Sequence, residues 1–240
     1  MPKKTLKKFD NQVTSVYDKI PKSMKTEYQN PNFDEHQINI PFRMLVVGAS
    51  GSGKSSVAIF LLSKMKNTFG NIKIFCRNKD EPLLEYLKTK IPKEQLPNLD
   101  LKDNEKGFNP TLQHLVIFDD LVLLKDAQSV RISEYFIRAR KIAKGISLMY
   151  LTQSYFRTPK TIRLNVNYLV VKKVAALRDL KFMMNEYNLG SSKEKLLEIY
   201  KYCTGDRNDF LLIDVDELPE KKFRKNLLEI LHVVDDNKLK

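Results

Sequence analysis

The chain of 240 residues contains no tryptophan, two cysteines and three histidines, and this scarcity excludes several kinds of site. Cys76 and Cys203 do not make a disulfide framework, so we expect reduced thiols of an intracellular protein. His36, His114 and His232 have no cysteine or histidine neighbours at metal-ligand spacing, so no zinc site is expected. No apolar run reaches the roughly 18 residues of a membrane span, and the lysine-rich start lacks the apolar core of a secretory signal.

Positive charge is in excess. Lysine and arginine number 42 and aspartate and glutamate 29, so the formal net charge is 42 − 29 = +13 and the isoelectric point is about 9.5. Such an excess predicts a polyanionic partner, with nucleic acid first and an acidic membrane surface second. The alternative interpretation is charge that serves only solubility in a lysine-rich composition.

The chain divides into two parts by composition. Residues 1–40 are interpreted as a basic N-terminal arm, in which four apolar residues at helical spacing predict one short amphipathic helix: Phe9, Val13, Tyr17 and Ile20. The alternative for this arm is a frayed basic tail. Residues 41–240 alternate apolar runs with amphipathic segments. This pattern predicts one α/β domain, with a mainly parallel sheet of about six or more strands and helices on both faces.

The periodicity places the individual elements. The expected strands are Met44–Gly48, Ile72–Cys76, Leu115–Asp119, Ile146–Thr152, Tyr168–Lys172 and Phe210–Asp214. The expected helices are Ser55–Lys66, Pro82–Lys90, Ser129–Ala143, Leu177–Tyr187, Lys193–Tyr202 and Glu220–Leu231, the last within a C-terminal helical segment at 217–240. Residues 92–110 are polar and rich in turn formers, so they are expected to form a surface insertion.

The stretch "GASGSGKS" after the first strand matches G-x-x-x-x-G-K-[ST] and lies between an apolar run and an apolar helix. In such a loop the backbone N–H groups surround a phosphate, and the following helix adds its positive end. Lys54 then supplies a charge to the β- and γ-phosphates, and the Ser55 hydroxyl is a Mg²⁺ ligand. The predicted nucleotide-binding residues are Gly48, Ala49, Ser50, Gly51, Ser52, Gly53, Lys54, Ser55 and Ser56.

Two further strands end in polar residues that suit hydrolysis. "HLVIFDD" carries Asp119 and Asp120 at the end of an apolar strand; we predict that Asp119 holds the Mg²⁺ shell and Asp120 polarises the attacking water. "ISLMYLTQ" ends in Gln153, the predicted sensor of the γ-phosphate. In hydrolytic motors of the additional-strand class this strand lies between the loop strand and the acidic strand. The alternatives are an acidic turn in solvent and a strand-end cap.

"PFRMLVVGASGSGKSS", "HLVIFDD", "YFIRARKIAKGISLMYLTQSYFRTPKTIRLNVNYLVV" and "LLIDVDELPEKKFRKN" together resemble the DNA-packaging ATPases of nucleocytoplasmic large DNA viruses, virophages and polinton-like elements, in the FtsK–HerA superfamily. The resemblance runs from Pro41 to Asn226, and "LTQSYFRTPKTIRLN" is its most specific part. It implies a RecA-like domain in an ATP-driven ring, a pentamer or hexamer, that moves double-stranded DNA into a capsid.

The resemblance also implies the surroundings of such a motor: Mg²⁺ as cofactor, ATP as substrate, capsid or portal proteins as partners, and the infected host cytoplasm and the virion as locations. The choice of ATP rests on this resemblance, because "NKDE" at 78–81 fails as a guanine-reading N-K-x-D motif. Residue by residue, the match puts Lys54 and Ser55 on phosphate and magnesium. It puts Asp119 and Asp120 in the acidic motif, although many relatives carry glutamate as the second acid, and Gln153 at the sensor position.

Ring motors of this group also use an arginine from a neighbouring subunit, which stabilises charge in the transition state. Arg138 and Arg140 in "FIRARK" are the predicted residues, with Arg163 next. Contacts to DNA are expected to be independent of sequence. Their candidates are Arg157, Lys160, Arg163, Lys172, Lys173, Lys221, Lys222, Arg224 and Lys225. The alternative for each is a charge in solvent.

Two other functions fit parts of the sequence. A nucleotide or nucleoside kinase is disfavoured by the second acid, by Gln153 and by the lack of an arginine-rich lid. A capsid-assembly component that binds nucleotide and hydrolyses it hardly at all is the alternative from another class. Stimulation of hydrolysis by DNA distinguishes a motor from that scaffold.

Overall fold

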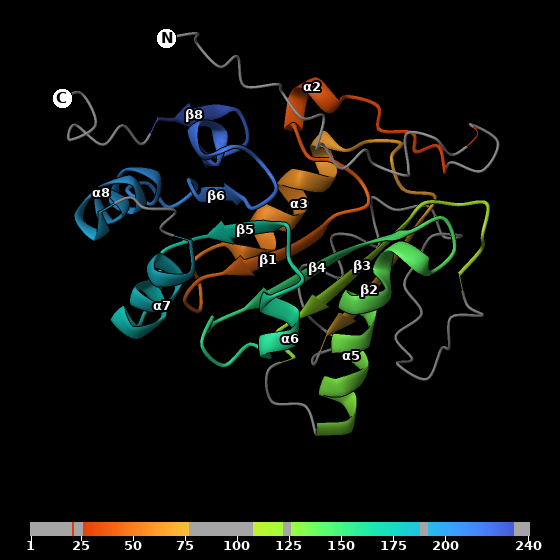
Figure 1. Ribbon diagram of the computed structural model, residues 1–240, viewed down its shortest axis with the longest axis horizontal. Helices are drawn as coiled ribbons and strands as arrows, with labels where there is room; N and C mark the ends of the chain where they lie inside the picture. The colour runs from red at the N-terminus through yellow and green to blue at the C-terminus, as the bar shows by residue number, and fades with distance from the viewer. Residues whose placement is uncertain (1–20, 22–25, 77–107, 122–125, 188–191, 233–240) are drawn as a thin grey trace, which may run out of the picture.

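The computed structural model describes residues 21, 26–76, 108–121, 126–187 and 192–232. Within these residues, eight strands form one sheet in the order β2-β3-β4-β1-β5-β6-β7-β8 (Figure 1). The strands are β1 (Arg43–Val47), β2 (Asn71–Cys76), β3 (His114–Asp119), β4 (Ile146–Thr152), β5 (Tyr168–Val171), β6 (Leu211–Asp214), β7 (Phe223–Lys225) and β8 (Glu229–Leu231).

The strands β1 to β5 are parallel, and β6, β7 and β8 continue the sheet with antiparallel pairing. The strand β4 lies between β1 and β3, so the predicted sensor strand separates the loop strand from the acidic strand. Val47 is level with Thr152, and Asp119 is level with Leu151. The carboxyl ends of β1, β3 and β4 therefore meet at one edge of the sheet, where open α/β sheets bind ligands.

Helices cover both faces of the sheet (Figure 1). They are α2 (Phe33–His36), α3 (Lys54–Lys64), α5 (Asp126–Arg138), α6 (Lys160–Arg163), α7 (Leu177–Tyr187) and α8 (Lys193–Cys203), with short 3₁₀ turns at Ala139–Lys141 and Pro219–Lys221. None of the helices in the described part of the chain is long and apolar enough to cross a bilayer.

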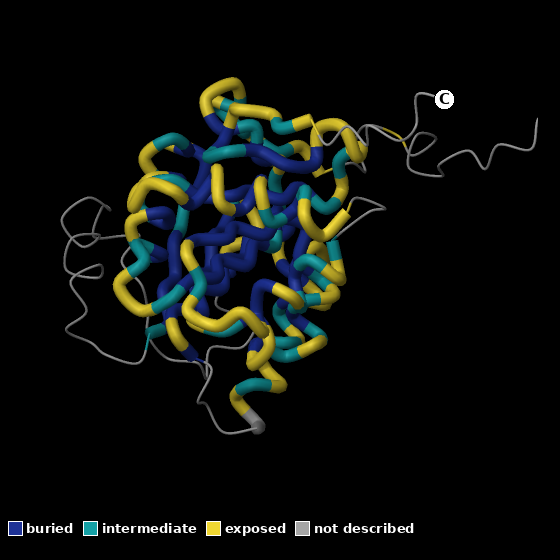
Figure 2. The backbone as a smooth tube through the Cα atoms, turned by 90° about the vertical axis from the view of Figure 1, so that its left-hand side faces the viewer, coloured by how far each residue is buried: buried dark blue, intermediate teal, exposed yellow. Residues whose placement is uncertain are grey.

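Alternate residues of each central strand enter two separate apolar cores. In β1, Leu45 and Val47 pack with α5, α6, α7 and α8, whereas Met44 and Val46 pack with α3. Because successive side chains of a strand point to opposite faces, an unbroken apolar run is the pattern that a sheet covered on both sides requires. Figure 2 shows buried segments of the chain at the centre of the molecule and exposed segments around them.

The α/β class with a mainly parallel sheet is confirmed, and each expected strand agrees with the structure to within one residue at either end. The predicted helix Leu177–Tyr187 is α7, and the prediction Lys193–Tyr202 stops one residue before the end of α8. The predicted helices at Ser55–Lys66 and Ser129–Ala143 correspond to α3 and to α5 with its 3₁₀ extension. The expected helix at Pro82–Lys90 lies outside the described residues, as does 92–107 of the expected insertion.

The predicted C-terminal helix at 217–240 is wrong for the residues that the structure describes. The strands β7 and β8 form a hairpin there, and Asn226 adopts a left-handed conformation (φ 56°) after β7. β7 pairs with β6, and Phe223 is only 2% exposed. The edge of β6 offers backbone hydrogen-bond partners to this segment. The spacing of apolar residues in "EKKFRKNLLEIL" does not reveal those partners, so tertiary pairing overrides the local helical propensity.

The boundary placed at residue 40 is also wrong for the described part of the arm. His36 and Ile38 are fully buried, and the Gln29 N–H donates to Gln113 Oε1 over 2.6 Å. Residues 26–40 therefore pack as part of the domain. The predicted amphipathic helix with Phe9, Val13, Tyr17 and Ile20 lies outside the described residues.

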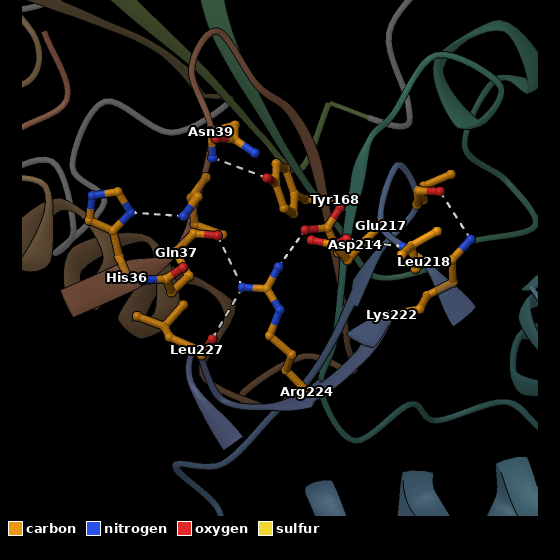
Figure 3. A network of polar contacts seen from close by, with 12 residues as sticks. His36, Gln37, Asn39, Tyr168, Asp214, Glu217, Leu218, Lys222, Arg224 and Leu227 are labelled. Atoms are coloured by element: carbon orange, nitrogen blue, oxygen red, sulfur yellow. Dashed lines mark hydrogen bonds and ion pairs between the residues drawn. The ribbon is translucent and has the colours of Figure 1, made fainter. Parts of the chain in front are cut away.

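A buried ion pair joins the C-terminal hairpin to the sheet and to this N-terminal segment (Figure 3). The Arg224 guanidinium on β7 pairs with the Asp214 carboxylate on β6, and both side chains are less than 10% exposed, at 7% and 5%. The same guanidinium donates to Gln37 O over 3.0 Å and to Leu227 O over 3.3 Å. Burial raises the pKa of Asp214, although Arg224 acts to lower it.

Candidate functional site

The glycine loop connects β1 to α3 at the carboxyl edge of the sheet. The Gly48 N–H donates to Thr152 O over 3.2 Å, which ties the start of the loop to β4. A Cβ atom on Gly48 would collide with the Ser52 hydroxyl and would lie 2.7 Å from Lys172 Cβ, so no larger residue fits. Gly53, the N-cap of α3, has φ 91°, which favours glycine. The sequence thus folds into a close turn whose backbone leads into a helix N-terminus.

Lys54 is the first residue of α3 and is 9% exposed. Its Nζ donates to Gly48 O and Ala49 O, both over 3.0 Å, so the ammonium lies inside the curve of the loop. Burial lowers the pKa of Lys54, while Asp120 and Asp119 act to raise it. This coupling shows that the loop lysine and the two carboxylates share one electrostatic environment.

Asp119 is the last residue of β3 and Asp120 follows it, and Gln153 follows the neighbouring strand β4. Asp119 is 8% exposed, whereas Asp120 is exposed and adopts φ 51°, an uncommon conformation for a residue other than glycine. The Asp120 N–H donates to Leu151 O over 3.1 Å, and Gln153 Nε2 donates to Asp120 Oδ2 over 2.8 Å. The structure therefore brings together the loop, the acidic pair and the predicted sensor.

The turn after Gln153 is held by a residue that the sequence analysis missed. Asp179, in the first turn of α7, is 4% exposed, and its Oδ1 accepts from Ser154 Oγ over 3.1 Å and from Phe156 N over 2.8 Å. Thr158 Oγ1 donates to Ser154 O over 2.9 Å on the other side of the turn. The signal in the sequence was an acidic residue in a helix first turn, which by itself indicates capping.

A second missed element is the loop between α8 and β6, with the sequence "TGDRND" at 204–209. Because β6 is antiparallel to β5, this loop arrives at the same edge as the phosphate loop. The Lys172 Nζ anchors it by donating to Arg207 O over 2.5 Å and to Asp209 O over 2.8 Å. The loop is polar and contains glycine, but its position depends on the direction of β6, which local patterns do not encode.

The comparisons with known proteins agree with this geometry. The family described as Poxvirus A32 protein matches residues 30–218. This chain belongs to the poxvirus A32 protein family. It is a family of packaging ATPases, so the resemblance to viral packaging ATPases of the FtsK–HerA type is confirmed. No curated protein matches the chain in a sequence comparison.

Solved structures agree with the A32-family fold. The genome packaging NTPase B204 of Sulfolobus turreted icosahedral virus 2, in complex with AMPPCP, has a TM-score of 0.54 and 16% identity, over 82% of this chain and 100% of that chain. B204, the DNA-packaging ATPase of Sulfolobus turreted icosahedral virus, has a TM-score of 0.52 and 17% identity, over 81% and 100% of the two chains. At these identities the likeness shows the fold, that of a RecA-like P-loop ATPase.

Three of the nine expected DNA contacts are engaged by other groups of this A32-family chain. Arg224 is buried in the pair with Asp214, and Lys172 is 2% exposed beneath the 204–209 loop. The Arg163 side chain is 11% exposed, pairs with Glu186 over 2.5 Å and lies over the Tyr155 and Phe182 rings. Each of these cations already has partners inside the fold, which disfavours a contact with a phosphate backbone.

The other expected contacts remain predictions. Arg157, Lys160 and Lys173 are exposed, and Lys221 is exposed beside the C-terminal hairpin. Lys222 is 7% exposed and donates from Nζ to Val215 O over 3.0 Å, so it too is engaged inside the fold. Lys225 pairs with Asp209 over 2.9 Å.

The predicted trans-acting arginines lie at the edge of the sheet opposite the phosphate loop. Arg138 ends α5 and Arg140 lies in the 3₁₀ turn before β4; both side chains are exposed. Arg140 acts to lower the pKa of Arg43, the first residue of β1, which places it near the amino ends of the strands. Neither arginine is near the phosphate loop of its own chain.

Proposed function

We propose that this A32-family chain is a Mg²⁺-dependent ATPase that forms a ring and moves double-stranded DNA into a viral capsid. One observation carries the hydrolytic part: the glycine loop, the two carboxylates at the end of β3 and Gln153 after β4 converge at one edge of the sheet, and Gln153 donates a hydrogen bond to Asp120 over 2.8 Å. A phosphate-binding loop beside a second acid favours water over a bound acceptor as the nucleophile.

The chain supplies three groups to the reaction. The loop N–H groups and Lys54 bind the phosphates, because an ammonium held inside the loop by two carbonyl oxygens at 3.0 Å lies where the phosphate chain would bind. Asp120 orients and polarises water as a general base. Gln153 holds the Asp120 carboxylate in place and can exchange that bond for one to a γ-phosphate, which couples the presence of nucleotide to the position of the base.

The donor set fits magnesium. Mg²⁺ prefers hard oxygen ligands and retains several waters, and the Ser55 hydroxyl at the start of α3 and the Asp119 carboxylate at the end of β3 provide two such ligands at one edge. When bound, the ion would neutralise charge on the phosphates.

The ring proposal rests on the placement of the phosphate loop and the two candidate arginines at opposite edges of the sheet. In a head-to-tail ring each subunit presents one edge to the opposite edge of its neighbour. Arg138 and Arg140 lie at the amino ends of the strands, so in such a ring they could reach a neighbour's site and not the site of their own chain. The formal charge of +13 and the exposed cations Arg157, Lys160 and Lys173 support binding to the DNA backbone.

Steady-state phosphate release with Mg-ATP tests this function, measured with and without non-specific double-stranded DNA, at low salt and at about 200 mM, where phosphate-driven binding fades. We expect hydrolysis without any acceptor, stimulation by DNA, and loss of that stimulation in salt. Lys54→Ala is the inactive control, and retained hydrolysis in it would contradict the site. Turnover indifferent to DNA would favour the capsid-assembly alternative instead.

A further inference from the structure

A second buried lysine lies against the phosphate loop. Lys172 directly follows β5, and its side chain is only 2% exposed. It extends from the first glycine of the loop to the last. A Cβ atom on Gly48 would lie 2.7 Å from Lys172 Cβ, and a Cβ atom on Gly53 would lie 3.7 Å from Lys172 Cε and 3.9 Å from Lys172 Nζ. The ammonium group is therefore held next to the N-cap of α3.

The hydrogen bonds of this ammonium go to neutral groups. Lys172 Nζ donates to Arg207 O over 2.5 Å and to Asp209 O over 2.8 Å, and within the described part of the chain no carboxylate forms an ion pair with it. The Asp209 carboxylate is engaged elsewhere, since it pairs with Lys225 over 2.9 Å and accepts from Asn226 Nδ2 over 2.9 Å. Burial lowers the pKa of Lys172, and Asp209 and Asp206 offset this effect only in part.

Such an arrangement leaves a positive charge without its counter-charge. Carbonyl oxygens satisfy the hydrogen bonds of an ammonium but do not neutralise it, and burial of a charge is costly unless the charge is paired. Lys54 is held in the same manner, because its Nζ donates to Gly48 O and Ala49 O, both over 3.0 Å. A phosphate chain bound in the loop would supply negative charge to both lysines, and attraction between charges in a poorly solvated site extends beyond van der Waals contact.

We propose that Lys172 is a second cation of the phosphate site, whose ammonium attracts phosphate groups bound in the loop and takes them as its counter-charge. Lys172 does not touch the reacting atoms in this proposal, so it strengthens binding before and during the reaction alike. It should therefore lower KM and have little effect on kcat. The inference rests on the proposed nucleotide-hydrolysing function and adds a residue to its binding site.

Calorimetry on the full chain tests the proposal with two ligands, AMPPCP and inorganic tripolyphosphate. Tripolyphosphate carries the negative charges without a nucleoside. Lys172→Met retains a long unbranched side chain and removes the charge. We expect both ligands to bind about tenfold more weakly, the order of one interaction between charges in a partly buried site. Steady-state hydrolysis of ATP should show KM raised by a similar factor, with kcat within about twofold of the wild type.

Lys222→Met is the matched control. Lys222 is 7% exposed, and its Nζ donates to a backbone carbonyl, Val215 O, over 3.0 Å (Figure 3). Its own carbonyl oxygen accepts from the N–H of Asp214, which is level with Tyr168 at the start of β5. Lys222 therefore lies at the edge of the sheet opposite the phosphate loop. Its replacement removes an equivalent buried charge and should leave the affinity for both ligands unchanged.

Lys172→Gln separates the charge from the hydrogen bonds. Glutamine is neutral but retains an N–H donor for the carbonyl oxygens of the 204–209 loop, so this variant also keeps the test valid if Lys172→Met does not fold. We expect it to lose affinity for both ligands as Lys172→Met does. Wild-type affinity in Lys172→Gln would limit Lys172 to anchoring the loop and would overturn the proposal.

Duplex DNA distinguishes the two possible sources of phosphate. Because Lys172 is buried, Lys172→Met should bind non-specific double-stranded DNA like the wild type. Weaker DNA binding together with unchanged tripolyphosphate binding would overturn the proposal and assign Lys172 to the DNA.

Three other results would also be decisive. An equal loss of affinity in Lys222→Met would show a general effect of removing a buried charge and would overturn the proposal. A fall in kcat with KM unchanged in Lys172→Met would do the same, because the lysine would then act on the transition state alone. A wild-type chain that binds neither AMPPCP nor tripolyphosphate would contradict the proposed function itself.

Discussion

Gln153 Nε2 donates a hydrogen bond to Asp120 Oδ2 over 2.8 Å, which joins two residues 33 positions apart in the chain. The bond connects the ends of β4 and β3, and it holds a carboxylate whose backbone has the uncommon φ of 51°. Uncommon backbone conformations persist where surrounding contacts hold them and occur often at functional sites. The bond therefore supports a role of the two residues as one unit.

Asp120→Asn tests the predicted base. Asparagine is similar in size and retains an oxygen that can accept from Gln153, so the change removes the charge with little change of shape. We expect kcat for ATP to fall by about 10²–10⁴-fold, the contribution of a general base, with nucleotide affinity retained. Single-turnover hydrolysis and nucleotide binding check this separately. A rate within a few-fold of the wild type would assign the base to another group.

Asp179→Ala tests the positioning of the turn after Gln153. Two donors, Ser154 Oγ and Phe156 N, lose their buried acceptor, which should lower the free energy of unfolding by about 1–3 kcal/mol. We also expect kcat to fall while KM is retained, because the turn carries Gln153. Asp179→Asn keeps an acceptor oxygen and should restore the rate. Lost stability with an unchanged kcat would limit Asp179 to a structural role.

Arg138→Ala and Arg140→Ala test the sharing of a site between subunits. At least one variant should be inactive alone and should regain activity when mixed with the Asp120→Asn protein, because each chain then supplies the residue that the other lacks. Phosphate release from mixtures at fixed total protein measures this. If no mixture regains activity for either arginine, the shared-site proposal loses its support.

Arg224→Met tests the buried ion pair. The substitution leaves the Asp214 carboxylate buried without its cation, which should lower the free energy of unfolding by about 3–5 kcal/mol. The loss should increase as the pH rises above the pKa of the free carboxyl, because burial already raises the pKa of Asp214 in the fold. Urea denaturation measures this loss. Lys221→Met is the control at an exposed lysine and should change stability little. The double variant Asp214→Asn/Arg224→Met removes the buried charge as well and should recover part of the loss.

Two buried histidines predict an acid-sensitive fold. Burial lowers the pKa of His36 and of His114, and Lys73 lowers that of His114 further. Both are neutral in the fold, so the unfolded chain binds protons first as the pH falls below about 6.5. The free energy of unfolding should then fall by up to about 1.4 kcal/mol per pH unit for each histidine, down to its folded pKa.

Urea denaturation at pH 7.5 and 5.5 measures this loss. His36→Asn should reduce the pH dependence, because asparagine does not titrate in this range. Its side-chain oxygen can accept from Ile38 N in place of His36 Nδ1, which does so over 3.0 Å, so the local hydrogen bond is kept. The exposed His232→Asn should leave it unchanged. Equal stability of the wild type at the two pH values would contradict the prediction.

Local patterns predicted most of the strands and the site residues on them. A strand buried on both faces must be apolar throughout, so β1, β3 and β4 are visible as runs, and polar residues at their ends stand out. The phosphate loop can be recognised in the sequence because few residues other than glycine fit its backbone at Gly48 and Gly53. Helical spacing misled at 217–232, where the amphipathic pattern also satisfies a short hairpin on a sheet edge.

The cations show a different limit. Lys172, Arg163 and Arg224 were equivalent in the sequence to Arg157, Lys160 and Lys173, yet the first three are engaged inside the fold and the last three are exposed. Whether a charge faces solvent depends on partners far away in the chain, such as Asp214 for Arg224. No property of the residue or its neighbours carries that information.

By itself, the sequence determined the fold class, the phosphate loop, the acidic pair and the polar end of the sensor strand, because each follows from residues adjacent in the chain. Only the tertiary structure decided that Gln153 meets Asp120 and that the 204–209 loop closes beside α3. Those contacts depend on strand order and direction, which arise from pairing and burial across the whole domain.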